Sequence, residues 1–502
     1  MLTHLRDRKK DFIFLLGIST ILMTFASMTS ILFPIHVGVD QNCFFTIGKS
    51  VLDGKVLYRD IYDQKGPLLF FIHTVAAMIS DKTFYGVYLL QIINFAVILG
   101  YVGKISDLFL DRKYNRLVTS VTGLVIVTAF CYSRGDNAEE FCMPILLIAL
   151  YHMLKFLNSS EERVSNRTML LHGLLASCIL WIKFTLLGFY IGWTLVIGVA
   201  IWKRKSFGEC CKAAILFLTG MVAGSIPYFL YFMYHGAVGE FLYDYFYTNI
   251  FMYSSQVTAI EKVIYFFTKD IMWNPVFTPL ILWGILYFLR SKTLGMSRDA
   301  KIGILVTCVL TYFFVFIGGT RYRYYLLILG AYVVFGVIAT IKIVERFLPL
   351  IFTKRRITFP IYIALYGVIL LSASNCLSFL YKSSDDYVQV QFAKIINQVE
   401  NPTLLNYNFL DGGFYLMADT PLPDTKFFCR QNIPRENFPE MYDEQEEIIR
   451  NGEVDFVIVR YGRKRPLEDF AECPELFTNY RKVSVVHEGI DDYYYALFEK
   501  IS

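Results

Sequence analysis

Two polar stretches, Val39-Asp-Gln-Asn-Cys43 and Tyr58-Arg-Asp-Ile-Tyr-Asp-Gln-Lys-Gly-Pro67, follow the first long apolar segment of this sequence. Both belong to one loop, residues 37–83, in a chain that is otherwise dominated by apolar side chains. The loop gathers the charged residues Asp40, Asp53, Arg59, Asp60, Asp63 and Lys65. Because such groups are costly to desolvate at a membrane, a cluster of them between apolar segments more often marks a functional site than a structural one.

The composition places the chain in a lipid bilayer. Of its 502 residues, 55% are hydrophobic and only 18% are charged, whereas a soluble protein has about 25% charged residues. Apolar runs of about twenty residues recur along the chain, which indicates a polytopic α-helical membrane protein. The net charge of +5 resides in short clusters between these runs, a pattern of topology determinants that predicts no nucleic-acid partner.

Eleven apolar runs are candidates for membrane spans: 12–36, 84–109, 117–133, 140–157, 168–184, 186–202, 212–234, 274–290, 302–318, 324–345 and 357–381. The first is longer than the apolar core of a signal peptide, so we expect it to be a retained span. The run 66–79 is shorter than the ~17 residues needed to span, so we expect an interfacial or re-entrant helix.

The distribution of basic residues supports this assignment. If 66–79 does not cross, all the basic clusters lie on one face, which the positive-inside rule makes the cytoplasm, with the N-terminus on that side. These clusters are 6–10, 112–116, 163–167, 203–212, 290–301 and 342–356. If 66–79 crossed, every cluster after the first would change sides.

The other loops, and the whole segment after Tyr381, then lie together on the outer face. These outer loops carry the charged residues Asp40, Lys65, Glu139, Glu140, Lys183, Arg321 and Arg323. We therefore expect these residues to form one extracytoplasmic site. The aromatic-rich outer segment 235–273 predicts an amphipathic surface helix over that site, although an aromatic belt without substrate contact is an equally good interpretation.

Residues 382–502 are more polar and predict a separate small extracytoplasmic α/β domain after a transmembrane domain of residues 1–381. Helices are expected at 385–400 and 436–451, the second closed by Gly452, and strands at 403–409, 426–428, 454–459, 482–486 and 493–498. The segment Asp411-Gly-Gly-Phe414 is a turn signal and no phosphate loop. We expect this domain to act as a lid or to dock the acceptor.

The ten cysteines show no CxxC spacing and no Cys/His pattern of metal ligands. Only Cys429 and Cys473 fall together in the polar region, where a disulfide is possible but two free thiols are the favoured interpretation. We expect no cofactor and no metal site. The carboxylates of Asp40, Asp60 and Glu140 leave open the alternative that a divalent cation binds among them.

Within the loop 37–83, Asp40 has the chemistry of a general base, which needs a carboxylate in a partly dehydrated pocket. A solvated acid or a helix N-cap is the structural alternative. Lys65 precedes Gly66-Pro67 at the start of the interfacial helix, where an ammonium can meet a lipid phosphate. Asp60 and Asp63 are further candidates, and a weak surface ion pair between Lys65 and Asp63 is the alternative.

Two later outer loops supply the other candidates. Glu139 and Glu140 open the fourth span, where the helix dipole also favours acids. We expect one to cap the helix and Glu140, which lies deeper, to serve the site. Lys183, Arg321 and Arg323 lie at outer turns against the positive-inside bias, which indicates either a bound anion or contacts with outer headgroups.

These motifs resemble the GT-C superfamily of membrane glycosyltransferases, especially the branch with protein O-mannosyltransferases and the aminoarabinose transferase. The resemblance rests on Asp40 after the first span, Lys65 to Pro67 before an interfacial helix, Glu139 to Pro144, and the Arg-Tyr-Arg-Tyr-Tyr turn at 321–325. It covers about the first 330 residues; the tail matches only in placement. Gly66 stands where the aminoarabinose enzyme usually has proline, and the second acidic loop has glutamate where some relatives have aspartate, which leaves donor and acceptor open.

The resemblance implies transfer of one sugar from a polyprenyl-phosphate donor to an acceptor hydroxyl outside the membrane, with inversion. The acceptor is a glycan, a lipid or a protein. Asp40 is then the base, Glu140 orients acceptor or sugar, and Lys65 with Arg321 or Arg323 neutralises the leaving phosphate. The alternatives are a transporter or flippase of lipid-linked saccharides, a ligase or polymerase, and a scaffold whose C-terminal domain binds a partner. Transporters often show internal repeats, which this sequence lacks.

Overall fold

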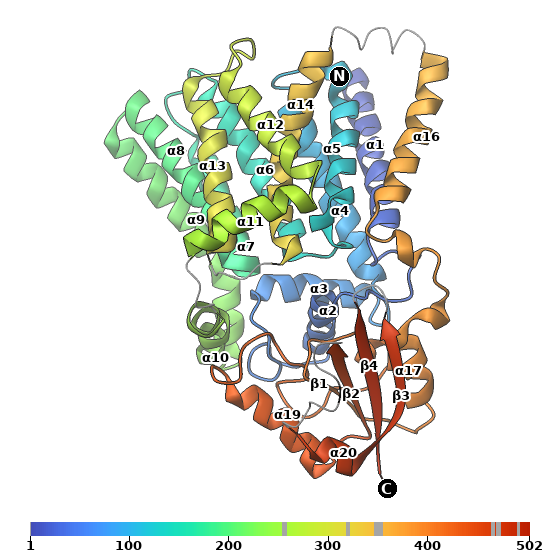
Figure 1. The fold of residues 1–502 in the computed structure, drawn as a ribbon. Coiled ribbons are helices and arrows are strands. Elements are labelled where there is room, and N and C mark those ends of the chain that lie inside the picture. Colours follow the sequence, from blue (N-terminus) through green and yellow to red (C-terminus); the bar gives the residue numbers. More distant parts are fainter. Residues whose placement is uncertain are drawn as a thin grey trace. The chain divides into compact units, whose positions relative to one another are not determined.

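The computed structural model describes residues 2–253, 259–317, 322–345, 355–462, 467, 473–488 and 492–501. The chain forms two compact units, each assembled from separate segments (Figure 1). The first unit comprises Met1–Ser30, Tyr88–Phe229 and Ser255–Leu377. The second comprises Ile31–Val87, Leu230–Ser254 and Ser378–Ser502.

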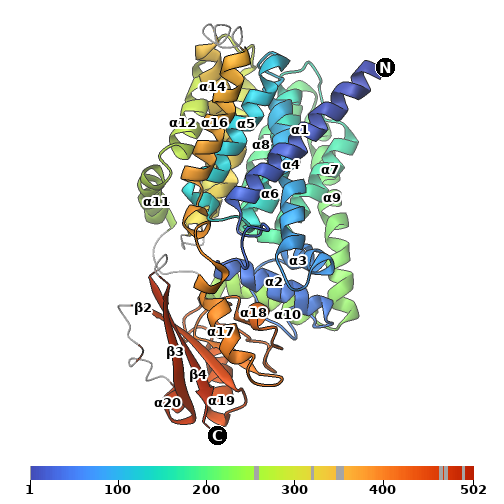
Figure 2. The same ribbon diagram turned by 90° about the vertical axis from the view of Figure 1, so that its right-hand side faces the viewer.

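The first unit is helical. Its long helices lie side by side in Figure 1 and Figure 2, as expected in hydrocarbon, where a helix satisfies its own backbone groups. They are α1 (Leu2–Ala26), α4 (Tyr85–Ser106), α5 (Asn115–Thr128), α6 (Ala138–Leu157), α7 (Asn166–Lys183), α8 (Gly188–Arg204), α9 (Phe207–Tyr234), α11 (Ala259–Trp273), α12 (Phe277–Arg290), α13 (Arg298–Phe316), α14 (Val333–Val344) and α16 (Arg355–Ala373). Four short 3-10 segments join them: η1 (Arg112–Tyr114), η2 (Phe130–Tyr132), η3 (Phe184–Leu187) and η5 (Arg323–Tyr332).

Six helical stretches among the described residues are long and apolar enough to cross a membrane. They are Tyr85–Ser106, Ala138–Leu157, Asn166–Arg204, Phe207–Tyr234, Arg298–Phe316 and Arg323–Val344. A seventh is added if Ile264–Trp273 and Phe277–Arg290, which meet at 110°, count as one bent span. The prediction of a polytopic helical membrane protein is confirmed, with fewer qualifying stretches than the eleven predicted runs.

The stretch Asn166–Arg204 contains two predicted spans. Lys183 is extended, with φ −159° and ψ 98°, which interrupts the helix before η3. His172 Nδ1 on α7 lies 3.2 Å from the hydroxyl of Tyr190 on α8. In a straight helix these residues would be about 27 Å apart, so the chain reverses direction at this break.

The first predicted span, 12–36, ends earlier than the hydropathy suggests. Helix α1 stops at Ala26, and the following Ser27 and Thr29 hydroxyls hydrogen-bond to each other and to Gln91 of α4. Short hydroxyl side chains compete in this way with helical hydrogen bonding. The predicted runs 117–133, 274–290 and 357–381 contain shorter helices than expected, α5, α12 and α16.

Close packing in the first unit depends on glycine at one helix pair. A Cβ on Gly284 of α12 would lie 2.3 Å from the backbone nitrogen of Gly336 on α14. A Cβ on Gly336 would lie 2.2 Å from the carbonyl oxygen of Leu280. The two helices therefore approach backbone to backbone, as small residues permit in membranes.

The second unit combines two outer segments with the C-terminal part of the chain. The segment 31–87 contributes α2 (Val39–Leu52) and α3 (Pro67–Ile79), and the segment 230–254 contributes α10 (Val238–Leu242) and the π-helix η4 (Tyr243–Met252). At thirteen residues, α3 is too short to span, as predicted. Aromatic residues of 235–273 are thus divided among α10, η4 and α11, where one surface helix was expected.

The C-terminal part holds a four-stranded sheet of order β1-β2-β4-β3. Its strands β1 and β2 are parallel, and β4 pairs antiparallel with both β2 and β3, with a bulge between Lys482 and Ser484. The elements are β1 (Leu404–Tyr407), β2 (Phe456–Gly462), β3 (Tyr480–Glu488) and β4 (Tyr493–Lys500), with η7 (Ser384–Asp386), α17 (Val388–Ile396), α18 (Phe414–Ala418), α19 (Pro439–Asn451) and α20 (Glu475–Asn479). Ile448 and Ile449 of α19 pack against Leu405, Val457 and Phe498 in one buried core.

The predicted helices and strands of this region are found, with one exception. Residues 426–428 form no strand; the carbonyl oxygen of Lys426 accepts a hydrogen bond from the Tyr62 backbone instead. Gly452 ends α19 in the left-handed conformation, φ 63°, as its position suggested. The sequence-based boundary at 381 also differs from the compact units, because the segment 31–87 packs with the C-terminal part.

Replacing Gly284 by alanine is expected to destabilise the protein, because the new methyl group overlaps the backbone of α14. Overpacking of this kind costs about 1–3 kcal/mol. Gly17→Ala is the matched control, since its Cβ meets nothing within 4 Å and alanine favours a helix. The midpoint of thermal unfolding in detergent should fall only for Gly284→Ala. Equal midpoints for the two variants would contradict the close approach.

Candidate functional site

Asp40 lies in the first turn of α2, directly after Gly38 and Val39. The side chain is half-buried, unlike the exposed Asp53 at the other end of the same helix. The helix begins here because Gly38 is extended, with ψ 130°, and its carbonyl oxygen accepts from the Asn42 backbone. An acid in a first helical turn is favoured by the helix dipole, so structure and function both suit this position.

Asp63 and Lys65 form the core of the polar loop. The Asp63 carboxylate is 2% exposed and accepts hydrogen bonds from the Lys65 backbone at 2.8 Å and from the Gln431 side chain at 2.8 Å. Burial raises the pKa of Asp63, the Lys65 charge opposes that shift, and the Asp40 charge adds to it. Asp40 and Lys65 are therefore each within electrostatic reach of Asp63.

Asp60 has a different setting. It pairs with the neighbouring Arg59 at 2.7 Å and accepts from the Val56 backbone at 2.8 Å. The hydrogen bond from Arg59 lowers the pKa of Asp60. Asp60 therefore stabilises the turn that leads into the loop, and its contacts give no sign of a ligand.

The conformation of this loop depends on the rest of the second unit. Tyr58 adopts the left-handed conformation, with φ 68°. Its hydroxyl donates to the carbonyl oxygen of Lys65 at 2.6 Å. Its ring stacks on Phe241 of α10 at 5.7 Å. The Asn249 amide donates to the carbonyl oxygen of Gln64 at 2.6 Å. A hydrogen bond within the loop and contacts from the distant segment 238–252 thus fix the backbone around Lys65.

A buried acid on η4 lies near the same loop. Asp244 is 1% exposed and pairs with Lys426 at 3.5 Å, and burial raises the pKa of Asp244 to about 7. The Lys426 ammonium also lies 5.6 Å from the centre of the Tyr62 ring. π-Helices often occur at functional sites.

A cavity of about 230 Å³ lies against the other side of α2, also in the second unit. Lys49, Ser50 and Asp53 of α2 line it together with Asp419 and Thr420 after α18. Lys49 and Lys82 pair with Asp419 at 3.6 Å and 3.2 Å. Hydroxyl, carboxylate and ammonium groups together suit a polyhydroxylated ligand.

In the first unit, Glu139 and Lys183 form a buried ion pair. The distance between Lys183 Nζ and Glu139 Oε1 is 2.6 Å, and the side chains are 11% and 0% exposed. The ammonium also lies 3.5 Å above the ring of Tyr325. Among the described residues, the other carboxylate oxygen, Glu139 Oε2, is buried without a hydrogen-bond partner. A buried oxygen in this state is a candidate ligand contact.

Glu140 has more partners than Glu139. It accepts from the Gln91 amide at 2.9 Å, the Asp136 backbone at 2.9 Å and the Tyr132 hydroxyl at 3.3 Å. These bonds hold a turn in which Ser133, Arg134, Gly135 and Asp136 all have positive φ, between 50° and 85°. Non-glycine residues adopt this conformation at a cost, so Glu140 stabilises a strained loop before α6.

Arg323 begins η5, and its guanidinium lies 5.0 Å from the centre of the Phe130 ring of η2. Segment η5 packs against both η2 and α6. The first unit therefore brings Glu139, Glu140, Lys183 and Arg323 to neighbouring helix ends. Arg321 lies outside the described residues.

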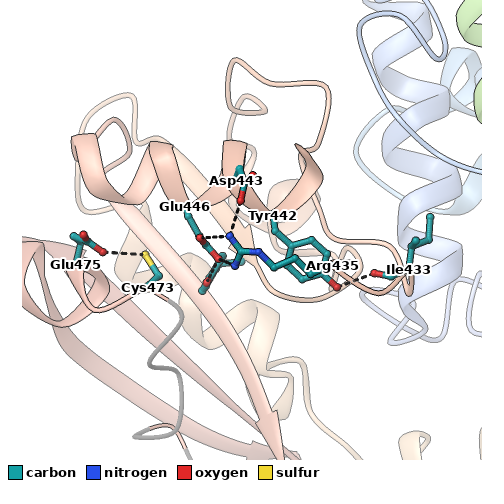
Figure 3. Close-up of polar contacts among 8 residues, drawn as sticks. Ile433, Arg435, Tyr442, Asp443, Glu446, Cys473 and Glu475 are labelled. Carbon is teal, nitrogen blue, oxygen red and sulfur yellow. Dashed lines mark hydrogen bonds and ion pairs between the residues drawn. The ribbon is translucent and has the colours of Figure 1, made fainter. Parts of the chain in front are cut away.

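The C-terminal sheet region has a polar cluster of its own, shown in Figure 3. Arg435 pairs with Glu446 at 2.7 Å and with Asp443 at 2.5 Å. Cys473 lies 3.8 Å from Glu475 and is 1% exposed. These pairs satisfy one another. Among the described residues, no group of three His, Cys, Asp or Glu side chains could hold a metal ion.

Sequence reasoning missed the groups that support the predicted ones. Gln91 and Tyr132 hold Glu140, Gln431 holds Asp63, and Asp244 pairs with Lys426. Only Gln91 and Asp244 had a usable signal, as polar residues among apolar or aromatic neighbours. Gln431 lies far along the chain from Asp63, and Tyr132, although only eight residues before Glu140, is one of many tyrosines and carried no distinguishing signal.

The fold is similar to that of solved membrane-protein structures. One is ArnT from Cupriavidus metallidurans bound to undecaprenyl phosphate, with 12% sequence identity over 97% of both chains and a TM-score of 0.55. Another is the same protein in the apo state, with 12% identity over 96% of both chains and a TM-score of 0.56. No family model and no curated protein matches the sequence. The likeness confirms the predicted resemblance at the level of the fold.

The two adjacent glutamates are expected to respond differently to replacement by glutamine. Glu140→Gln puts an amide N–H₂ among three hydrogen-bond donors and should cost about 1–3 kcal/mol of stability. Glu139→Gln leaves the buried Lys183 ammonium without a compensating charge and also costs stability. Adding Lys183→Met should recover most of that loss and none of the loss caused by Glu140→Gln. Thermal unfolding in detergent measures these variants, and full stability of Glu140→Gln would overturn the structural role given to Glu140.

Proposed function

We propose that this chain, a polytopic membrane protein with the GT-C fold, transfers one sugar from a polyprenyl phosphate to an acceptor hydroxyl, with inversion. The observation that carries the proposal is the likeness over 97% of the chain to a structure of ArnT bound to undecaprenyl phosphate. The positions of Asp40 and Lys65 in the polar loop add independent support, because the reaction needs a base and a cation for the leaving phosphate.

In the proposed reaction, the acceptor oxygen attacks the anomeric carbon as the bond from that carbon to the phosphate oxygen breaks. The acceptor proton passes to Asp40, and the phosphate leaves with the electron pair. A half-buried carboxylate in the first turn of α2 suits this task, because partial dehydration makes it a better base.

Lys65, Lys183, Arg321 and Arg323 are the proposed ligands of the phosphate. Negative charge grows on the leaving phosphate in the transition state, so fixed cations stabilise that state most. Lys65 suits this role because its main chain is fixed. Its backbone N–H donates to the Asp63 carboxylate, and its carbonyl oxygen accepts from the Tyr58 hydroxyl. Asp63 contributes by positioning Lys65, and Asp60 by shaping the turn before it.

Glu139 and Glu140 remain candidates for orienting the sugar or the acceptor. The contacts favour Glu139, because one of its buried oxygens lacks a partner among the described residues, whereas both oxygens of Glu140 accept hydrogen bonds. This reverses the roles that the sequence suggested. Lys183 then has two tasks, since it pairs with Glu139 and carries positive charge for the phosphate.

We further propose that the second unit lies on the extracytoplasmic side, with the N-terminus in the cytoplasm, on the basis of the positive-inside rule. The segment 382–502 would dock the acceptor, and the cavity of about 230 Å³ beside α2 has polar groups suited to a sugar. Its volume is below the roughly 300–1,000 Å³ of pockets for drug-sized ligands, so it has room for about one sugar ring.

Asp40→Asn is expected to reduce sugar transfer by at least about 100-fold, because the amide cannot accept the acceptor proton. Asp81→Asn, an exposed acid after α3, is the matched control and should retain activity. Transfer is measured in proteoliposomes with radiolabelled polyprenyl-phosphate sugars, and thermal unfolding verifies folding. Normal transfer by Asp40→Asn would remove this residue from the mechanism.

Lys65→Ala is expected to weaken binding of polyprenyl phosphate by about 10- to 100-fold, the value of one charged hydrogen bond. Binding of the matching neutral polyprenol should change little, and Lys55→Ala in the same loop serves as control. Microscale thermophoresis in detergent measures both affinities. Equal losses for the two lipids would show that Lys65 acts without recognising the phosphate.

A further inference from the structure

Two cysteine thiols that are far apart in sequence meet inside the second unit. Cys43 on α2 and Cys429, between α18 and α19, have their sulfur atoms 3.7 Å apart. Each residue is 1% exposed. In the sequence, 386 positions separate them, so only the tertiary structure brings them together.

Polar contacts hold the backbone around the two thiols in place. The Thr46 hydroxyl, one turn along α2 from Cys43, donates to the Asp411 carboxylate at 2.6 Å. The Asp411 backbone N–H points to the Cys43 sulfur at 3.3 Å. A disulfide has an S–S bond of about 2.05 Å, so a gap of about 1.7 Å has to close, which small rotations of the two side chains can share.

We propose that Cys43 and Cys429 form a disulfide that links α2 to the C-terminal part of the second unit. The inference rests on the outer location given under the proposed function, because disulfides persist in oxidising compartments. Two S–H bonds break and one S–S bond forms. The two protons and two electrons pass to the disulfide of a thiol–disulfide oxidoreductase, whose S–S bond is reduced to two thiols.

Burial determines when this bond can form and how it can be broken. Burial raises the pKa of both thiols, so the reactive thiolate is scarce in the folded protein. Oxidation therefore belongs to the folding process, before α2 and the segment around Cys429 enclose the sulfurs. Once folded, the bond should resist reductants until the protein is denatured.

The linkage would join two parts of the candidate site. Cys43 follows Asp40 by three residues on the same helix, and Cys429 precedes Gln431, whose amide holds Asp63 at 2.8 Å. A covalent bond here limits the movement of the proposed base relative to the loop of Lys65. The sequence left open a pairing of Cys429 with Cys473, but in the structure Cys429 lies against Cys43, whereas Cys473 lies beside Glu475 (Figure 3).

The test counts thiols in the full-length protein. Cells are quenched with acid, free thiols are blocked with N-ethylmaleimide in denaturant, and the purified protein is treated with a polyethylene-glycol maleimide before or after reduction. We expect reduction to expose two new thiols in the wild-type protein. We expect none in Cys43→Ser or Cys429→Ser, and two in the matched control Cys473→Ser. Non-reducing peptide mapping of the wild type should find one cross-linked pair with Cys43 and Cys429.

The proposal is overturned if reduction exposes no new thiol in the wild-type protein, or if the two thiols persist in Cys43→Ser. Peptide mapping keeps the test independent of whether a serine variant folds. Asp40→Asn should keep the cross-linked pair, so failure of the proposed transfer reaction and failure of the disulfide are distinguishable.

Discussion

Every buried charge in this chain has to be compensated inside the protein, because neither hydrocarbon nor a closed loop supplies water for it. The helical unit meets this requirement at the start of α6, where Lys183 neutralises Glu139 and three donors surround Glu140. Removing one partner of such a group leaves an uncompensated polar atom, which costs more than the contact itself contributes. The positions of these residues are therefore tightly constrained.

The same requirement explains the backbone strain before α6. Four consecutive residues with positive φ are tolerated because Glu140 accepts from the backbone of Asp136 and from Tyr132, and because the carbonyl oxygen of Arg134 accepts from Met28. Strain of this kind persists only where the surroundings over-determine the conformation. Here the strained loop precedes a carboxylate pair at one helix start, in which Glu139 pairs with Lys183 and both oxygens of Glu140 accept hydrogen bonds.

In the second unit, the polar loop takes its shape from segments that the sequence separates widely. Asn249, Lys426 and Gln431 each contribute one hydrogen bond to residues 58–66 or receive one from them. This explains why the compact unit combines 31–87, 230–254 and the C-terminal part, whereas hydropathy alone divides the chain at 381. A hydropathy profile registers where a segment leaves the membrane, but it carries no information on which outer segments pack together.

The sequence by itself determined the membrane class, the short length of α3, most elements of the C-terminal sheet, and the polar loops that contain the candidate residues. These features follow from local composition and periodicity, which a single segment carries in full. Only the tertiary structure distinguished the surroundings of Glu139 from those of Glu140, ended α1 at Ala26, and brought Cys43 to Cys429. The physical reason is that the energy of a buried polar group depends on its partners, and many of those partners lie tens to hundreds of residues away in the chain.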